Sequence, residues 1–485
     1  MITITRRQAH GLRGVFRRSA LGLIRRGPVP FLVLRAEGRQ LRAVYRYGAL
    51  AVEHVGSCDP SSDGMVMLPL DALADFEGRD ETPVVLEAAT PDRTTARWVD
   101  RGIPQTREYA APALDTPGPL PGTPMPWTIA PARLLDALAE ASATSVDGST
   151  RYALDCVQIR AVDAGHEIVA TDGHQFLVQG GFRLPWQGDV LVRRSPVFAC
   201  KALPRDRPLE VGKTADHIVV QAGPWTLFLE VQTEARFPRV EGAIPGPGSA
   251  LTTLRLDPVD VQFLLPALDR LPGRDELNAP ATLDLNGCVA VRARGEEQSQ
   301  VTELVLTRSG YDGPPVQVNT NREFLSRALR LGFTEVEIST PESPLVCRDA
   351  LRIFAWQPLS KESAIAPSDD VTRIASSQCI TTEPVCEGRL TNVKARTTLN
   401  EPRPMNGRAI QNGDAPDHVT TAENPAPDGL AALIREAEAL QEALSDARNR
   451  TGRLVVALRR HRKRERLVSS TLATLRELKL SEVVG

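Results

Sequence analysis

The residues with the clearest potential for chemistry lie in the segment VATDGHQFLV, from Val169 to Val178. Asp172 and His174 are two positions apart, so on a strand their side chains would point to the same face. An acid beside a histidine is typical of catalytic sites, but the pair also needs a nucleophile or a metal ion. The sequence has no GxSxG, HExxH or DxD motif, and its seven histidines show no metal-ligand spacing. We therefore predict a structural turn at the mouth of a pocket, with no catalytic residue, metal or cofactor.

Arginine is the second residue type whose distribution indicates a function. In the predicted helix at 6–21, RRQAHGLRGVFRRSAL, basic and apolar side chains fall on opposite sides, and no acidic residue lies among them. Further arginines occur in the predicted helices at 193–203 and 320–331. Such helices can contact DNA phosphates without reading bases, although a solvated surface is the ordinary alternative. The candidate phosphate contacts are Arg6, Arg13, Arg17, Arg193, Arg194, Lys201, Arg327 and Arg330.

The helices that carry these residues belong to a plan that recurs along the chain. Each unit has a short strand, an amphipathic helix, alternating strands, a second helix and further strands, with a period of roughly 125 residues. The first helices are predicted at 6–21, 131–141 and 258–271, and the second helices at 68–76, 193–203 and 320–331. The alternating segments predict antiparallel sheets with helices on one face, which is an α+β fold. Proline- and glycine-rich segments at 111–127 and 244–250 mark the boundaries.

Length and composition narrow the class of protein. A chain of 485 residues with 42% hydrophobic residues is long enough for about three domains with their own cores. Its seven scattered cysteines form no CxxC motif, which indicates a reducing cytosol rather than disulfides or a zinc site. No apolar run reaches the roughly 18 residues that span a membrane, and no segment resembles a signal peptide. We therefore predict a cytoplasmic protein with no membrane partner, whose net charge of −2 still permits a basic DNA-binding surface.

The C-terminal part of the chain has a different composition. Residues 361–427 are rich in Ser, Thr, Pro, Asn and Asp, and no Phe, Trp or Tyr occurs after Trp356. Such a segment buries too little apolar area to fold, so we predict a disordered linker. Leucines and alanines from Leu430 to Leu475 then follow a heptad pattern, which predicts a helix at 428–483 that forms a coiled coil or packs on the body. Its segment RRHRKRER, at 459–466, fits a nucleic-acid patch, an anionic partner or a solubilising face.

Three segments resemble the bacterial DNA polymerase III beta subunit, the sliding clamp. They are RYALDCVQIRAVDAGHEIVATDGHQFLV at 151–178, ARFPRVEGAIP at 235–245 and VNTNREFLSRAL at 318–329. The resemblance covers about residues 1–360 and implies three clamp domains, followed by the disordered linker and the long C-terminal helix. The implied boundaries are 1–115, 125–247 and 250–360 for the clamp domains, 361–427 for the linker and 428–483 for the helical tail.

The family assembles two subunits head to tail into a ring through which duplex DNA passes. The resemblance therefore implies a homodimeric processivity factor that binds double-stranded DNA. It also implies a pocket between the second and third domains for peptides of DNA polymerase and clamp loader subunits. Carried over residue by residue, this pocket includes Leu154, Thr171, Gly173, His174, Gln175, Phe176, Pro245, Val346, Ile353 and Ala355.

The sequence also departs from the family at positions that matter for this pocket. Gln175 and Phe176 replace an arginine and a leucine, and Asp155-Cys156 replaces Asn-Gly. FAWQPL at 354–359 stands where the family ends in Met-Pro-Met-Arg-Leu. Two interpretations remain open. The chain is either a distant working clamp or a clamp-derived scaffold that does not encircle DNA and recruits partners through its tail.

Overall fold

The structure is a computed structural model of the whole chain. It describes residues 1–379 except 21–30, 91, 112–119, 147–152, 240–241, 243, 275, 277, 296–299 and 369. The described residues belong to one compact unit, Met1–Glu387. The predicted helical tail at 428–483, and the predicted linker beyond residue 379, lie outside the described residues. No described helix is long and apolar enough to cross a membrane.

The same order of elements occurs three times along the described chain. The first run contains β1 (Ile2–Thr5), α1 (Arg6–Ser19), β2 (Phe31–Glu37), β3 (Gln40–Tyr47), β4 (Leu50–Ser57), β5 (Gly64–Pro69), η1 (Leu70–Ala72), α2 (Leu73–Phe76), β6 (Pro83–Thr90), β7 (Arg93–Asp100) and β8 (Ile103–Ala110). The second run contains β9 (Thr128–Ala130), α3 (Arg133–Thr144), β10 (Cys156–Val162), β11 (Gly165–Thr171), β12 (Gln175–Phe182), β13 (Val190–Arg193), η2 (Pro196–Ala199), β14 (Leu209–Lys213), β15 (His217–Ala222) and β16 (Trp225–Glu230).

The third run repeats this order with one additional short strand, and three further elements follow it. The run contains β17 (Thr252–Arg255), α4 (Pro258–Leu268), β18 (Pro280–Leu285), β19 (Val289–Ala293), β20 (Val301–Leu306), β21 (Gly310–Asp312), β22 (Val316–Asn321), α5 (Arg322–Arg330), β23 (Glu335–Ile338), β24 (Leu345–Arg348) and β25 (Arg352–Trp356). After it come η4 (Lys361–Ser363), β26 (Val371–Ala375) and η5 (Ser376–Cys379).

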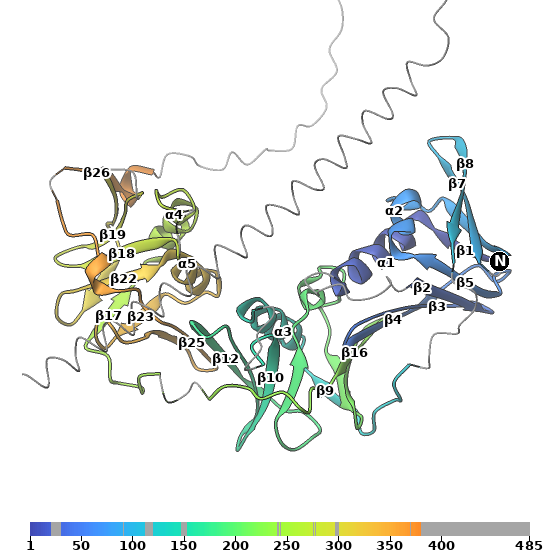
Figure 1. Cartoon of the computed structure of the whole chain (residues 1–485), viewed down its shortest axis with the longest axis horizontal. Helices are drawn as coiled ribbons and strands as arrows, with labels where there is room; N and C mark the ends of the chain where they lie inside the picture. The colour runs from blue at the N-terminus through green and yellow to red at the C-terminus, as the bar shows by residue number, and fades with distance from the viewer. Residues whose placement is uncertain are drawn as a thin grey trace, which may run out of the picture. The chain divides into compact units, whose positions relative to one another are not determined.

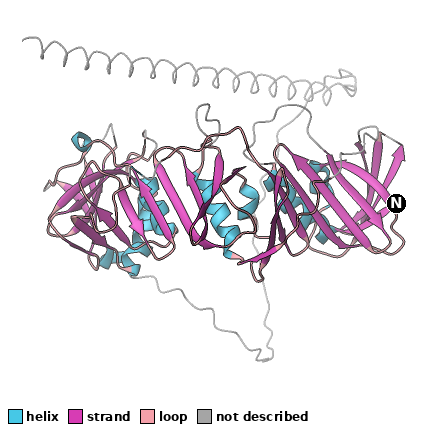
Figure 2. Cartoon of the chain, turned by 90° about the horizontal axis from the view of Figure 1, so that it is seen from below, coloured by secondary structure: helices cyan, strands magenta, loops and turns pink. Residues whose placement is uncertain are grey.

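Two large sheets join the three runs of elements. One has eight strands, in the order β5-β2-β3-β4-β16-β15-β14-β9, and the other has nine, in the order β13-β10-β11-β12-β25-β24-β23-β17-β21. The joining pairs, β4 with β16 and β12 with β25, are antiparallel. The two smaller sheets are β1-β6-β7-β8 and β22-β18-β19-β20-β26. Figure 2 shows these sheets with the helices packed against them.

Helix α1 illustrates why the sequence forms these elements. The Oγ1 of Thr5 accepts a hydrogen bond from the amide of Gln8 at 3.1 Å, and the Gln8 side chain accepts one from the Thr5 amide at 2.8 Å. This capping box satisfies two amides that a helix start leaves unpaired. The apolar side of the helix, including Leu12 and Phe16, is buried and packs on β3 and β4 (Figure 1).

The hydrophobic core connects the first and second runs of elements. Trp225, on β16, lies 5.5 Å from the ring of Phe16, on α1, in an edge-to-face arrangement, and 4.4 Å from the ring of His54, on β4. Phe16 also contacts Tyr45, with ring centroids 5.9 Å apart. Aromatic pairs at these separations add stability beyond the apolar area they bury. The joint between β4 and β16 is therefore supported by packing as well as by main-chain hydrogen bonds.

The prediction of a helix at 193–203 is wrong in its extent. The structure has only the short 3-10 turn η2 there, which begins after Ser195, whose Oγ accepts a hydrogen bond from the Val197 amide at 3.3 Å. The guanidinium of Arg205 donates hydrogen bonds to the carbonyls of Phe198, Cys200 and Leu203. An arginine a few residues further along the chain thus satisfies carbonyls that a longer helix would have paired internally. The helix predicted at 68–76 is also shorter, because β5 continues to Pro69 before η1 begins.

The prediction that the linker is disordered from residue 361 is wrong for its first part. β26 pairs in parallel with β20, from Val301 beside Val371 to Val305 beside Ala375. Ile374 packs against the core of the third run of elements, and Arg373 forms an ion pair with Glu303. The segment is therefore ordered by apolar and charged partners on the sheet. The lack of aromatic residues, on which the prediction of disorder rested, does not reflect these contacts.

Candidate nucleic-acid and peptide interface

The arginines of α1 have acidic partners that come from other elements. Arg6 forms an ion pair with Asp100 at 2.8 Å, and its side chain is 14% exposed. Arg13 forms one with Glu77 at 2.6 Å. Arg17 is exposed. The absence of acids within the helix sequence therefore did not mean that its basic face is unpaired, because Glu77 and Asp100 follow much later in the chain.

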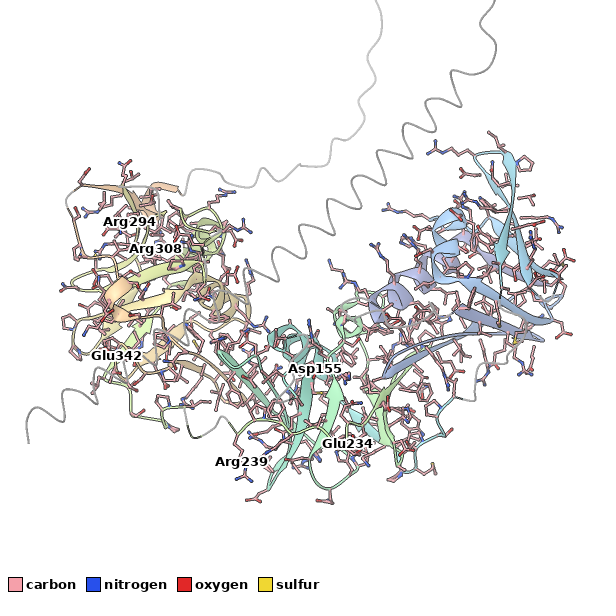
Figure 3. All side chains as sticks on the ribbon, viewed as in Figure 1. Asp155, Glu234, Arg239, Arg294, Arg308 and Glu342 are labelled. Atoms are coloured by element: carbon pink, nitrogen blue, oxygen red, sulfur yellow. The ribbon has the colours of Figure 1, made fainter. Side chains whose placement is uncertain are left out.

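Two of the three predicted phosphate contacts of the second run also have partners within the protein. Arg193 forms an ion pair with Asp155, which Figure 3 labels. The Nε of Arg194 donates a hydrogen bond to the carbonyl of Ser142 at 3.0 Å. Lys201 is exposed beyond the end of η2. Among the three described candidates of this run, Lys201 is the one that is exposed and forms no ion pair.

In the third run, the two candidate arginines of α5 lie in different surroundings. Arg327 is mostly buried, and its Nη2 donates hydrogen bonds to the Glu140 carbonyl at 2.6 Å and to the Thr144 Oγ1 at 2.7 Å. Burial lowers the pKa of its guanidinium, and the nearby carboxylates of Glu140 and Asp172 partly oppose this. Arg330 is exposed and pairs with Asp269 at 3.2 Å. Arg327 thus links α5 to α3.

Three exposed basic residues lie where α1 meets η2. The Sγ of Cys200 donates a hydrogen bond to the Gly14 carbonyl at 3.5 Å, which holds the two elements together. Arg17 and Arg18 follow Gly14 by one helical turn, and Lys201 follows Cys200 directly. All three are exposed, and no ion pair joins them to another described residue. We call Arg17, Arg18 and Lys201 the α1–η2 patch.

The TDGH segment forms a tight turn between β11 and β12. Asp172 is its organising residue, because its Oδ1 accepts hydrogen bonds from the amides of His174 and Gln175 at 2.8 and 2.9 Å. Its Oδ2 accepts another from the Gln175 side chain at 2.8 Å. Gly173 has a φ of +92°, a conformation that side chains disfavour. The carboxylate is thus occupied by the turn, and His174 is exposed rather than paired with it.

Several predicted pocket residues share one face of the nine-stranded sheet. Phe176 lies opposite Ala355, which lies opposite Val346, and Thr171 lies opposite Phe176 on the other side. Ile353 is two residues before Ala355 and therefore points to the same face. Phe176 is 5% exposed, and Ile353 is partly buried. The structure thus brings these five residues together from four strands.

The chain's own segment between β16 and β17 covers part of this face. Phe237 and Ile244 pack on the cluster that contains Val169, Phe176 and Val178. Pro245 lies in the same segment, and its carbonyl accepts a hydrogen bond from Arg348. Leu154 approaches Gly173, since a β-carbon at that glycine would lie 3.9 Å from the Leu154 Cδ1. The predicted pocket residues therefore surround an apolar face that is already partly filled.

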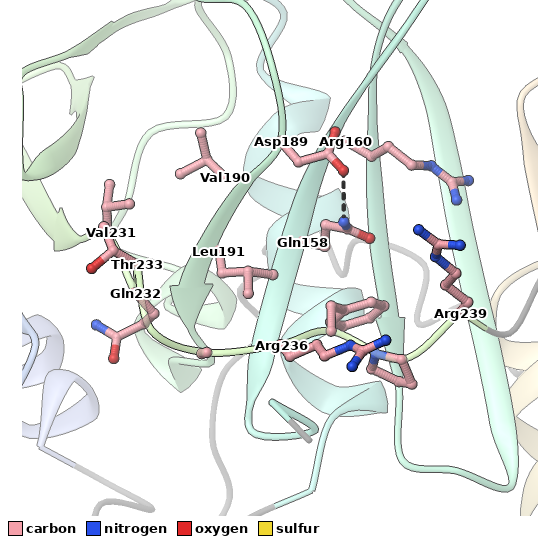
Figure 4. Close-up of a pocket in the computed structure, with 13 residues that line it drawn as sticks. Gln158, Arg160, Asp189, Val190, Leu191, Val231, Gln232, Thr233, Arg236 and Arg239 are labelled. Carbon is pink, nitrogen blue, oxygen red and sulfur yellow. Dashed lines mark hydrogen bonds between the residues drawn. The ribbon is translucent and has the colours of Figure 1, made fainter. Parts of the chain in front are cut away.

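A cavity of about 690 Å³ lies beside this cover, on β10 and β13. Figure 4 shows its floor of apolar side chains, including Leu191, and the hydrogen bond of 3.0 Å from Gln158 to Asp189. Three arginines reach it, namely Arg160, Arg236 and Arg239. None of the predicted pocket residues lines it. Sequence reasoning missed these arginines, although two of them stand in the quoted segment ARFPRVEGAIP.

This arrangement is suited to binding. An apolar floor with arginines at its edge suits a peptide that has apolar anchors and an anionic end. Among the described residues, no three His, Cys, Asp or Glu side chains gather where they could hold a metal ion.

Comparisons with known proteins agree with this architecture. Neither a protein-family profile nor a curated protein sequence matches the chain. Among solved structures, the DnaN sliding clamp (DNA polymerase III subunit beta) of Pseudomonas aeruginosa bound to griselimycin matches with a TM-score of 0.61 and 18% identity, over 74% of this chain and 99% of that chain. The chain has the sliding-clamp fold.

Two further clamps give the same result at lower identity. A putative DNA polymerase III beta subunit from Eubacterium rectale matches with a TM-score of 0.61 and 13% identity, over 75% of this chain and 99% of that chain. The DNA polymerase III beta chain of Streptococcus pneumoniae matches with a TM-score of 0.61 and 14% identity, over 74% of this chain and 100% of that chain. The similarity thus spans whole clamps, and this chain carries an additional region.

Proposed function

We propose that the chain is a DNA sliding clamp-like processivity factor of the cytoplasm, which encircles duplex DNA as a head-to-tail homodimer. The observation that carries this proposal is the pair of continuous sheets that join three successive runs of the same elements. We take these runs as clamp domains at 1–115, 125–247 and 250–360. In this role the chain makes and breaks no bonds, and it acts as a non-catalytic accessory subunit of a DNA polymerase.

DNA contact is assigned chiefly to the α1–η2 patch. Arg17, Arg18 and Lys201 are exposed and form no ion pair with another described residue, so they are available to phosphates. Contacts of this kind are independent of sequence and weaken as salt rises. They would hold the duplex without favouring any position along it, as sliding requires.

A salt titration of DNA binding tests this assignment. We expect the double variant Arg17→Ala, Lys201→Ala to lower the slope of log affinity against log salt by about one to two units, because each lost phosphate contact removes about one released counterion. Fluorescence anisotropy of a labelled duplex measures the slope.

The matched control is Arg97→Ala, which removes an exposed arginine of β7 that is paired with Glu87 of β6 at 2.9 Å. This variant should keep the slope of the unmodified chain. An unchanged slope in the double variant would contradict the assignment of DNA contact to the α1–η2 patch.

The partners that dock on the clamp are proposed to be DNA polymerase and clamp loader subunits, through short peptides. The apolar face around Phe176 and the neighbouring cavity beside Phe237 support this proposal. Phe237 belongs to the cover of the face and also lines the cavity. A peptide anchor that replaces Phe237 on the face would leave the arginines of the cavity to bind its anionic end.

One observation favours the second candidate, a clamp-derived scaffold that does not encircle DNA. Of the eight candidate phosphate contacts, Arg6, Arg13, Arg193 and Arg330 are in ion pairs and Arg327 is mostly buried. Such pairing reduces the charge that phosphates would meet. A scaffold would show almost no salt-dependent DNA binding, and its partners would co-purify only when residues 428–485 are present.

A further inference from the structure

The two strand pairs that join successive runs, β4 with β16 and β12 with β25, occupy equivalent positions in their runs. In the first two runs of elements, the third strand after the first helix carries the joint. This strand is β4 in the first run and β12 in the second. Each pairs with the last strand of the next run, namely β16 and β25, over five residue pairs. By the same rule, β20 of the third run would pair with the last strand of a following run.

No fourth run lies among the described residues, but the first run ends in a strand with a free edge. β8 ends the first run, and within the described part of the chain it pairs with β7 alone. The rule therefore assigns β8 of a second copy to the edge of β20. This would continue the same joint from one chain to the next.

In this structure the edge of β20 is already occupied. β26 pairs with β20 over five residue pairs, as many as each of the two joints uses. Its direction is parallel, whereas both joints are antiparallel. Each backbone amide and carbonyl on that edge can serve only one neighbouring strand at a time. β26 and a strand of a second copy therefore compete for the same hydrogen bonds.

Side chains hold β26 on this edge. Arg373 donates a hydrogen bond to the Glu303 carboxylate at 2.5 Å, and Glu303 is 3% exposed. Directly after the strand, the buried Ser376 accepts a hydrogen bond through its Oγ from the Thr307 amide at 3.0 Å. Ile374 adds apolar contact with the core. The strand is thus attached by charge, by hydrogen bonds and by packing.

The other edge, β8, carries features that discourage strand pairing. Pro104 has no amide hydrogen, and Arg107 and Glu108 place charges on the strand. Prolines and charges are the usual protection of an exposed edge strand. In contrast, the joining strands β16 and β25 read WTLFLE and RIFAW and are largely buried. The β8 edge is therefore a weaker competitor than the strands that form the internal joints.

We propose that β26 is a cap in cis on the edge of β20, and that β8 of a second copy docks there only after β26 has left. This inference rests on the proposed function, which requires two copies to join. A cap that occupies the edge most of the time lowers the fraction of chains competent to dimerise. It weakens the apparent affinity between copies by the same factor.

Two variants of the full chain test the cap in opposite directions. The lock, Thr302→Cys with Thr372→Cys, places a disulfide between residues paired in register on β20 and β26. It is made in a Cys288→Ser background, because Cys288 is an exposed thiol. The release variant, Arg373→Glu with Ile374→Asp, removes the ion pair and the apolar contact. Arg255→Glu, which reverses an equally exposed, ion-paired arginine on β17, is its control.

Sedimentation velocity over a concentration series measures the association of copies. We expect the release variant to dimerise at a concentration lower by about tenfold or more than the unmodified chain and the Arg255→Glu control. The oxidised lock should remain monomeric, and reduction should restore the behaviour of the unmodified chain. An oxidised lock that dimerises as readily as its reduced form would overturn the proposal. So would a release variant that folds and does not associate more readily.

Retention on DNA separates this proposal from the proposed function. A released chain that dimerises but is not retained on circular DNA would refute encirclement and leave the cap intact. A locked chain that dimerises and is retained on circular DNA would refute the cap and leave the clamp function intact.

Discussion

Replacing Trp225 with alanine should lower the free energy of unfolding by about 3–5 kcal/mol. The indole is 4% exposed and packs between Phe16 of α1 and His54 of β4, so its removal leaves a cavity at the joint of the first two repeats. The surrounding sheet can close this cavity only in part, because both strands are held by their ladder hydrogen bonds. Denaturant unfolding followed by far-ultraviolet circular dichroism measures the loss.

Ile129→Ala is the matched control for this prediction, because Ile129 is 73% exposed on the edge strand β9. We expect Ile129→Ala to change the free energy of unfolding by no more than about 0.5 kcal/mol, as is usual for surface substitutions. If Trp225→Ala lowered the free energy of unfolding by a similarly small amount, the joint between β4 and β16 would not depend on this packing.

Replacing Arg327 with alanine should destabilise the protein by about 2–4 kcal/mol and leave the salt slope of DNA binding unchanged. The guanidinium is mostly buried and donates to the Glu140 carbonyl and the Thr144 hydroxyl of α3. Its removal leaves these two acceptors without their donor and takes one of two nearby cations from the Glu140 carboxylate. Burial already raises the pKa of Glu140, an effect that Arg352 and Arg327 oppose.

Arg330→Ala on the same helix is the control, because this arginine is exposed and pairs with Asp269 at the surface. We expect Arg330→Ala to lower the free energy of unfolding by less than about 1 kcal/mol. If Arg327→Ala left stability unchanged and reduced the salt slope, the arginine would face DNA as the sequence alone predicts. The interpretation of Arg327 as a link between α3 and α5 would then be wrong.

Local sequence patterns predicted where the helices lie better than they predicted which side chains contact them. The helix predicted at 6–21 is α1, because its apolar period and its capping residues agree on the same start. The helices predicted at 131–141 and 258–271 correspond to α3 and α4, and the one at 320–331 corresponds to α5. The TDGH turn was also predictable, since glycine and a short acidic side chain are what such a turn requires.

Features that depend on distant contacts were not predictable in this way. Arg6 finds Asp100 ninety-four positions later, so the basic face of α1 could not be recognised as paired from the helix alone. The position of β26 likewise depends on β20 and on Glu303, which lies seventy positions before Arg373. For the candidate site, the sequence predicted the residues around Phe176 but not the arginine-lined cavity beside them. Residues between Val231 and Arg239, which follow β16 along the chain, supply much of the lining of that cavity.

Topological retention on DNA tests the central claim most directly. The full chain with Arg373→Glu and Ile374→Asp is mixed with a linear duplex, the duplex is ligated into a circle, and bound protein is measured at high salt by gel filtration. We predict that the chain stays on the ligated circle, because a closed ring needs no electrostatic contact to remain, and that cutting the circle releases it. Equal loss from circular and linear DNA, under conditions in which the chain is dimeric, would contradict the claim that it encircles duplex DNA.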